Sequence, residues 1–168
     1  MIMLASPEHY KAIVQIYNQA VRTGVQTADQ QEITVDDKLD WLQQHDGKHY
    51  CIYVAVEDGN VVGYLALSPY RQGRTAFYHT AKISYYLDSS KQGGGIGTEL
   101  IEHALSQCPV LKIENLVAIL LSCNSRSIAL LEKFGFKRWG VMPKIVQLNI
   151  GNVDHYYYGI KLLSEKQV

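Results

Sequence analysis

The sequence lacks an excess of charge of either sign, and it lacks long apolar runs. Sixteen Lys and Arg residues balance sixteen Asp and Glu residues, which leaves a formal net charge of zero at pH 7. This balance offers no bulk electrostatic attraction for nucleic acid or for an anionic membrane. The amino terminus has neither the basic nor the long apolar region of a signal peptide, and no apolar run is long enough to cross a bilayer. We therefore expect a cytoplasmic protein that uses no nucleic acid and no membrane.

Cysteine is also scarce. Cys51, Cys108 and Cys123 are odd in number and have no CxxC spacing, which argues against both a disulfide framework and a zinc knuckle. The chain has no internal repeat, low-complexity tract or Pro/Ser-rich linker, and 47% of its 168 residues are hydrophobic, enough for one substantial core. We predict a single domain over residues 1–168, with no metal site.

Four helices are predicted from apolar spacing and capping residues. They are expected at 6–21, 34–44, 98–108 and 124–135. Ser6 is the expected N-cap of the first helix, with Pro7 at its first position. Thr34 begins a capping box with Asp37, and Asn124 is the expected N-cap of the last helix.

Strands are predicted between these helices. A hairpin over 50–70 turns at Asp58-Gly59-Asn60, and strands follow at 76–88 and 115–123, the latter apolar enough to be buried on both faces. The tail over 137–163 is expected to form strands with a hairpin at Gly151-Asn152. The order of elements predicts an α/β fold whose sheet has mixed strand directions.

The stretch "QGGGIG", residues 92–97, stands between a predicted strand and a predicted helix. Backbone N–H groups and the helix dipole would converge there on an anion, usually a phosphate. A P-loop would need a lysine after the last glycine, but Thr98 and Glu99 follow. A dinucleotide fingerprint would need a third glycine where Leu100 stands. Both nucleotide hydrolysis and NAD binding are therefore disfavoured.

The remaining pattern, Gln-x-x-Gly-x-Gly at Gln92, Gly95 and Gly97, resembles the pyrophosphate loop of the GCN5-related N-acetyltransferases (GNAT superfamily), which bind acetyl-CoA. The segment "SCNSRSIALLEKFGFKRWG" resembles the next motif of that superfamily. The resemblance implies a GNAT-type fold: a mixed, mostly antiparallel sheet with flanking helices and the glycine-rich cofactor loop between strand and helix.

Within the superfamily the chain resembles the phosphinothricin acetyltransferase-like group over nearly its whole length. The segments "IYNQAVRTGVQT", "HTAKISYYLDSSKQGGGIG" and "GNVDHYYYGIKL" carry this resemblance. It implies a homodimer, a pantetheine arm beside β-strand residues 85–87, and a pyrophosphate held by backbone amides of residues 93–98. The cofactor-binding set implied in this way is Tyr85, Tyr86, Leu87, Gln92, Gly93, Gly94, Gly95, Ile96, Gly97, Thr98, Asn124 and Ser127.

Two positions depart from the group's pattern. Lys82 stands where the group carries a glutamate read as the base, and Leu131 stands where an acid is usual. A thioester is attacked only by a neutral amine. At pH 7 the neutral form of a peptide-like α-amine, with pKa ~8, costs ~1.4 kcal/mol. The neutral form of a lysine-like amine, with pKa ~10.4, costs about 4.6 kcal/mol, so that amine needs a base. Lys82 therefore favours a small acceptor with a low-pKa amine, such as an amino acid whose carboxylate Lys82 pairs with.

Other residues are open to two readings. His79 could relay a proton, or it is an ordinary surface or core histidine. Lys82 could itself be a base if burial lowers its pKa, or it is a solvated charge. His155 and residues 156–158 either line a pocket or pack in the core or a dimer. Lys91 and Arg126 could meet phosphate oxygens.

The sequence thus predicts an acetyl-CoA-dependent N-acetyltransferase that modifies a small-molecule amine. The alternatives are a non-catalytic acyl-CoA-binding protein, and a peptide or protein N-acetyltransferase with a shallow open groove. The acceptor is expected to be selected by the loop over residues 22–32 and by the terminal hairpin, where no motif restricts the chemistry.

Overall fold

The structure is a computed structural model, which describes residues 1–162. Its strands form one seven-stranded sheet in the order β1-β2-β3-β4-β5-β7-β6. The strands are β1 (Ile2–Leu4), β2 (Cys51–Glu57), β3 (Asn60–Pro69), β4 (Thr80–Leu87), β5 (Asn115–Leu121), β6 (Lys137–Leu148) and β7 (Gly151–Lys161). The helices are α1 (Tyr10–Thr23), α2 (Val35–Gln43), α3 (Ile96–Gln107) and α4 (Ser125–Lys133), with short 3-10 turns at Pro7–His9, Thr75–Phe77 and Ser89–Lys91.

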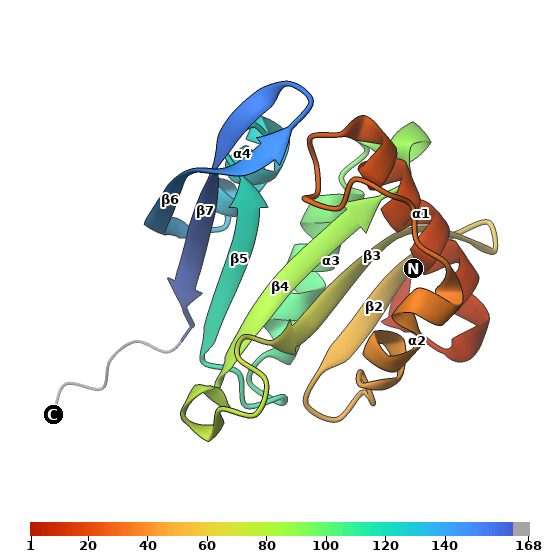
Figure 1. The fold of residues 1–168 in the computed structure, drawn as a ribbon. Helices are drawn as coiled ribbons and strands as arrows, with labels where there is room; N and C mark the ends of the chain where they lie inside the picture. Colours follow the sequence, from red (N-terminus) through yellow and green to blue (C-terminus); the bar gives the residue numbers. More distant parts are fainter. Residues whose placement is uncertain (163–168) are drawn as a thin grey trace, which may run out of the picture.

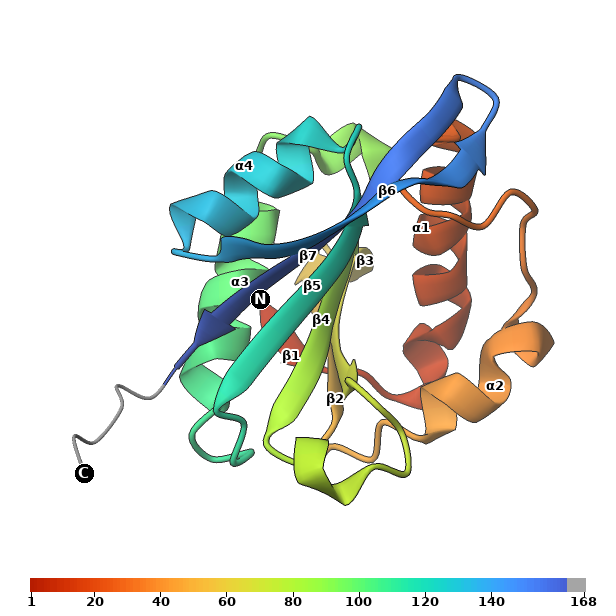
Figure 2. The same ribbon diagram turned by 60° about the vertical axis from the view of Figure 1, so that its left-hand side comes forward.

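Helices cover both faces of the sheet (Figure 2), with α1 and α2 on one face and α3 and α4 on the other. The core on the α3 side includes Leu65, Leu100 and Phe136, whereas the core on the α1 side includes Ile13 and Val54. Only β4 and β5 run parallel, and every other neighbouring pair is antiparallel. The predicted α/β fold with a mixed, mostly antiparallel sheet is confirmed. No helix within residues 1–162 is long and apolar enough to span a membrane.

The predicted Asp58-Gly59 turn and the Thr34 cap form as expected, whereas Ser6 caps the 3-10 turn Pro7–His9 and α1 begins only at Tyr10, with His9 as its N-cap. Glu57 pairs with Asn60, so Asp58 and Gly59 form a two-residue hairpin turn with φ angles of 49° and 77°. The N–H of Asp37 donates to Thr34 Oγ1 at 3.2 Å at the start of α2. These side chains therefore set where their elements begin.

The structure corrects several predicted boundaries. The short edge strand β1 was not predicted, because three residues are too few to show an alternating pattern. β4 begins at Thr80 rather than 76, because residues 75–77 form a 3-10 turn. The last hairpin turns at Asn149 and Ile150, since Leu148 pairs with Gly151. Residue 163 of the predicted tail lies outside the described residues.

Candidate active site

The site lies where β4 and β5 separate. The two strands pair only between residues 80–82 and 115–117, and beyond Lys82 they diverge (Figure 1). β3 pairs with the other edge of β4, so β4 backbone groups that face β5 are left open beyond Lys82. Two cavities, of about 620 and 360 Å³, adjoin this opening. They share the lining residues Gln26, Ile83, Ser84, Tyr86, Ile119 and Leu120. Molecules bound in the two cavities can therefore meet beside β4.

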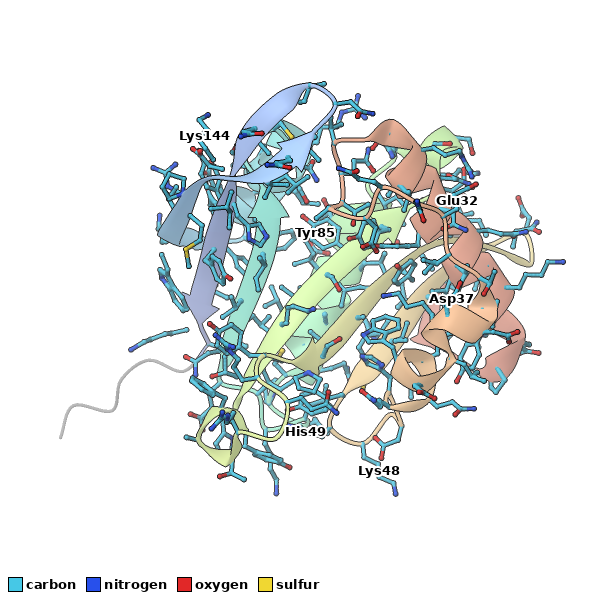
Figure 3. The ribbon with its side chains drawn as sticks, viewed as in Figure 1. Glu32, Asp37, Lys48, His49, Tyr85 and Lys144 are labelled. Atoms are coloured by element: carbon cyan, nitrogen blue, oxygen red, sulfur yellow. The ribbon has the colours of Figure 1, made fainter. Side chains whose placement is uncertain are left out.

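The larger cavity contains most of the residues that the sequence analysis assigned to a cofactor. Its lining includes ten of those twelve: Tyr85, Tyr86, Leu87, Gln92, Gly93, Gly95, Gly97, Thr98, Asn124 and Ser127. Figure 3 shows Tyr85 at the opening between β4 and β5. Gly94 and Ile96 are not among the lining residues, and the side chain of Ile96 is buried in the core.

The glycine loop presents bare backbone at one end of this cavity. Gly93 and Gly95 have φ angles of 86° and 91°, which favour glycine, and Gly95 is the N-cap of α3. A Cβ atom at either position would meet no other atom within 4 Å, so open space surrounds both. At Gly97 a Cβ would lie 3.0 Å from Leu130 Cδ2, so this glycine allows α3 to approach α4. The first N–H groups of α3 have no acceptor within the helix and can bind an anion.

Helix α4 forms the opposite wall of the larger cavity. Asn124 Oδ1 accepts a hydrogen bond from the Ser127 N–H at 3.3 Å, which confirms Asn124 as the N-cap of α4. Ser127 Oγ donates to Tyr85 Oη at 2.8 Å, and the Tyr85 hydroxyl donates to the Ser127 carbonyl oxygen at 3.3 Å. Burial raises the pKa of Tyr85 to about 12, so its hydroxyl stays protonated at neutral pH. Tyr85 thus fixes β4 against the first turn of α4.

The smaller cavity lies on the face of the sheet that α1 and α2 cover. Aromatic side chains from four elements line it, namely Tyr17 of α1, Trp41 of α2, Tyr64 of β3 and Tyr86 of β4. The hydroxyl of Tyr17 donates to Asp29 and also bonds Thr27 Oγ1 at 2.9 Å, which ties the loop after α1 to this wall. The predicted acceptor-selecting loop, residues 22–32, thus contributes Gln26, Thr27 and Ala28 to the cavity.

Two lysines line the same cavity from different elements. Lys82 extends from β4, and Lys38 extends from α2 with its Nζ 5.3 Å from the ring centre of Tyr17 and 5.2 Å from that of Trp41. Burial lowers the pKa of Lys82, and the nearby charge of Lys38 lowers it further. His155 of β7 also lines the cavity, and burial lowers the pKa of its imidazole, which favours the neutral form. No aspartate or glutamate is among the lining residues. A carboxylate base therefore does not line this cavity.

The match of the chain to a family model identifies the protein family to which these cavities point. The model of the acetyltransferase (GNAT) family matches residues 10–136, which include β4, the glycine loop and α4. The chain belongs to the GNAT family. As a GNAT enzyme it is an N-acetyltransferase that uses acetyl-CoA. The larger cavity, which the glycine loop lines, is the candidate acetyl-CoA cleft.

Individual relatives support this assignment. YwnH, a phosphinothricin acetyltransferase-like protein of Bacillus subtilis, is 32% identical over 98% of both chains. The L-methionine sulfoximine/L-methionine sulfone acetyltransferase of Salmonella typhimurium is 28% identical, covering 86% of this chain and 84% of its own. A GNAT phosphinothricin acetyltransferase from Sinorhizobium meliloti, solved with acetyl-CoA, has a TM-score of 0.89 and 25% identity, covering 96% of this chain and 87% of its own.

The two residues considered for catalysis, Lys82 and His79, lie in different places. Lys82 lies at the junction of the cavities, but His79 lines neither of them and is exposed. The Nδ1 of His79 bonds the Lys112 carbonyl oxygen at 2.7 Å, near the closed end of the β4–β5 pair. Leu131, at the usual acid position, lines the larger cavity and is 1% exposed. The structure thus brings Lys82, but not His79, to the place where the two cavities meet.

The two cations that could meet phosphate oxygens, Arg126 and Lys91, lie in different places. Arg126 lines the larger cavity, whereas Lys91 forms an ion pair with Glu57 at 2.8 Å and lines neither cavity. The sequence analysis missed Lys38 and Trp41, which lie three residues apart on one face of α2. Their spacing was visible, but it fits a helix packed on any surface. Among residues 1–162, no three His, Cys, Asp or Glu side chains are grouped to hold a metal ion.

Proposed function

We propose that this GNAT enzyme transfers the acetyl group of acetyl-CoA to the α-amino group of a free amino acid or a close analogue. The observation that carries this proposal is the smaller cavity, which joins the acetyl-CoA cleft at Ile83 and Ser84 and has Lys82 at that junction. Its volume of about 360 Å³ suits a small molecule better than a peptide, for which an extended groove would be needed. The named relatives that acetylate methionine sulfoximine or methionine sulfone support the same substrate class.

The proposed reaction needs few groups from the protein. The neutral amine forms a bond to the thioester carbonyl carbon, the C–S bond breaks, coenzyme A leaves as the thiolate, and the amine loses a proton. Open backbone N–H groups of β4 near Tyr86 and Leu87 stabilise the negative charge that develops on the carbonyl oxygen. Lys82 pairs with the carboxylate of the acceptor and so orients its amine.

Removal of the amine proton has no carboxylate base, because Lys82 stands where the phosphinothricin acetyltransferase-like group carries a glutamate. Water can accept the proton of a peptide-like α-amine of pKa ~8, about a tenth of which is already neutral at pH 7. The α-amine of a free amino acid lies beside a carboxylate and is more basic, so it gains more from a proton acceptor on the protein. His155 lines the acceptor cavity with a lowered pKa, so it offers a neutral imidazole as an additional proton acceptor. Direct attack of this kind requires no metal ion. The proposed reaction therefore uses none.

We further propose a cytoplasmic homodimer that acts independently of nucleic acid and membrane. Cys51, Cys108 and Cys123 are all free thiols, which is typical of a reducing compartment. The edge strand β6 exposes several large apolar side chains, which a second copy of the chain would cover: Trp139, Val141, Met142 and Ile145.

Release of coenzyme A thiol, measured with a panel of amines, tests the proposed reaction. We expect release with one or more free amino acids and none with peptides or polyamines. Release with peptides alone would identify a protein-modifying enzyme instead. Binding of acetyl-CoA without release by any amine would leave only a binding protein.

A further inference from the structure

We propose that the preferred acceptor is an amino acid with an acidic side chain, and that Lys38 and Lys82 each hold one of its two carboxylates. This inference rests on the proposed function and narrows its substrate class. It begins from the charges of the acceptor cavity, which are all positive or neutral. Lys38 and Lys82 line it, His155 is the other titratable nitrogen base there, and no Asp or Glu is among the lining residues.

The two ammonium groups lack counter-ions. Among residues 1–162, neither Lys38 nor Lys82 forms an ion pair. The carboxylate of Asp29 lies beyond the cavity lining and accepts a hydrogen bond from Tyr17, and Glu32 pairs with Arg22. A partly buried charge without a partner is costly, and the two lysines also repel one another. An acceptor with two negative groups relieves both effects.

The positions of the lysines assign the two carboxylates. Lys82 lies next to Ile83 and Ser84, where the acceptor cavity joins the acetyl-CoA cleft. Because the α-carboxylate is beside the reacting amine, Lys82 binds the α-carboxylate. Lys38 enters from α2, between Tyr17 and Trp41. It can therefore hold the distal carboxylate.

The rest of the lining fits the carbon chain between these groups. Ile13, Val14 and Ile33 provide apolar surface for methylene groups. A cationic acceptor such as lysine would be repelled by both ammonium groups, and a neutral side chain would leave Lys38 without an anionic partner. Glutamate and aspartate are therefore favoured over glutamine, asparagine and lysine.

Matched pairs of acceptors test this inference on the unmodified enzyme. We expect kcat/KM for glutamate to exceed that for glutamine by about tenfold or more, and the same order for aspartate over asparagine, since a charged hydrogen bond is lost in each amide. Equal or higher values for the amides would overturn the inference. This comparison requires no variant, so it does not depend on any variant being folded.

A variant then assigns the distal contact. Lys38→Met keeps the apolar stem that packs on Tyr17 and Trp41 but removes the charge. We expect it to lower kcat/KM for glutamate by about tenfold and to change that for glutamine by less than about twofold. Lys133→Met is the matched control, because Lys133 lies over the Phe134 ring at 5.9 Å on α4 and lines neither cavity. An equal loss with both acceptors in Lys38→Met would overturn the assignment.

The outcomes also separate this inference from the proposed function. If methionine or glutamine is acetylated well and glutamate is not, only the acidic preference is wrong. If no free amino acid releases thiol, the proposed function itself is wrong.

Discussion

Arg126 donates a hydrogen bond from its Nη1 to Oε1 of Gln92 at 2.8 Å, and so links the start of α4 to the glycine loop. Both residues line the acetyl-CoA cleft, and the guanidinium is the exposed cation on this wall that can reach a phosphate oxygen. We expect Arg126→Ala to raise the KM for acetyl-CoA by about threefold to tenfold, an effect that shrinks at high salt. Lys91→Ala is the control, since Lys91 pairs with Glu57 outside the cleft. Equal KM values in Arg126→Ala and the parent would contradict a phosphate role.

The backbone of Gly95 provides a second prediction for the same cleft. Gly95 and Gly73 both have positive φ angles, 91° and 72°, and a Cβ at either would meet nothing within 4 Å. Alanine at each position should therefore cost about 1–2 kcal/mol of stability from backbone strain alone. Only Gly95→Ala should also weaken acetyl-CoA binding in calorimetry, because only Gly95 lines the cleft. If the two variants bound acetyl-CoA with the same Kd, the glycine loop would not be the pyrophosphate site.

Most of the residues assigned to the cofactor from the sequence line one cavity because local backbone chemistry brings them together. A glycine loop at a helix start, an Asn cap and a strand beside them are features of contiguous segments, and ten of the twelve predicted residues line one cavity. The two exceptions have simple causes. Ile96 is an apolar residue at the start of α3 whose side chain packs into the core. A Cβ at Gly94 would lie 3.5 Å from the Lys91 carbonyl oxygen, whereas one at Gly93 or Gly95 would meet open space.

The acceptor cavity was less predictable, because distant segments assemble it. Lys38 and Lys82 are far apart in the sequence, and they face one cavity only because α2 packs over the sheet beside β4. The pattern of α2 shows which face is apolar but not which strands that face covers. His79 shows the converse error: it is close to Lys82 in sequence, yet the separation of β4 and β5 begins only after Lys82. Proximity along a strand therefore did not indicate proximity to the site.

Lys82 gives a prediction about pH. Burial and Lys38 lower its pKa below the ordinary value of 10.5, so it loses its charge at a lower pH than an exposed lysine does. If its ammonium group holds the acceptor carboxylate, the KM for the amino acid should rise as pH increases through this lowered pKa. Lys82→Ala should have a high KM at every pH and lose this dependence. A variant that acetylates amino acids as well as the parent would disprove the pairing.

The exposed apolar side chains of β6 predict how the chain associates. Ile145 is 60% exposed on this edge strand, where we propose the dimer contact. Light scattering should give twice the chain mass of 19.0 kDa for the parent and the single-chain mass for Ile145→Lys. Val110→Lys is the control, because Val110 is 78% exposed but lies between α3 and β5. A monomeric parent, or a dimeric Ile145→Lys variant, would exclude this interface.

His45 predicts how stability depends on pH. Its Nδ1–H donates to the Trp41 carbonyl oxygen at 2.7 Å, so the neutral ring accepts at Nε2 from the Ser68 hydroxyl at 2.9 Å. Burial lowers the pKa of His45 below 6.5. As pH falls below 6.5 the unfolded chain therefore takes up a proton that the native protein resists, and stability is lost.

The melting temperature of the parent should accordingly drop between pH 7.5 and 5, with a contribution of the same sign from His155, whose pKa is also lowered by burial. His45→Gln removes the titrating ring, so its melting temperature should be lower at pH 7.5 but should fall less on acidification. Ser68→Ala is the control, because it loses the same hydrogen bond yet keeps the imidazole. If His45→Gln and the parent lost the same number of degrees, the buried imidazole would not be the acid-sensitive group.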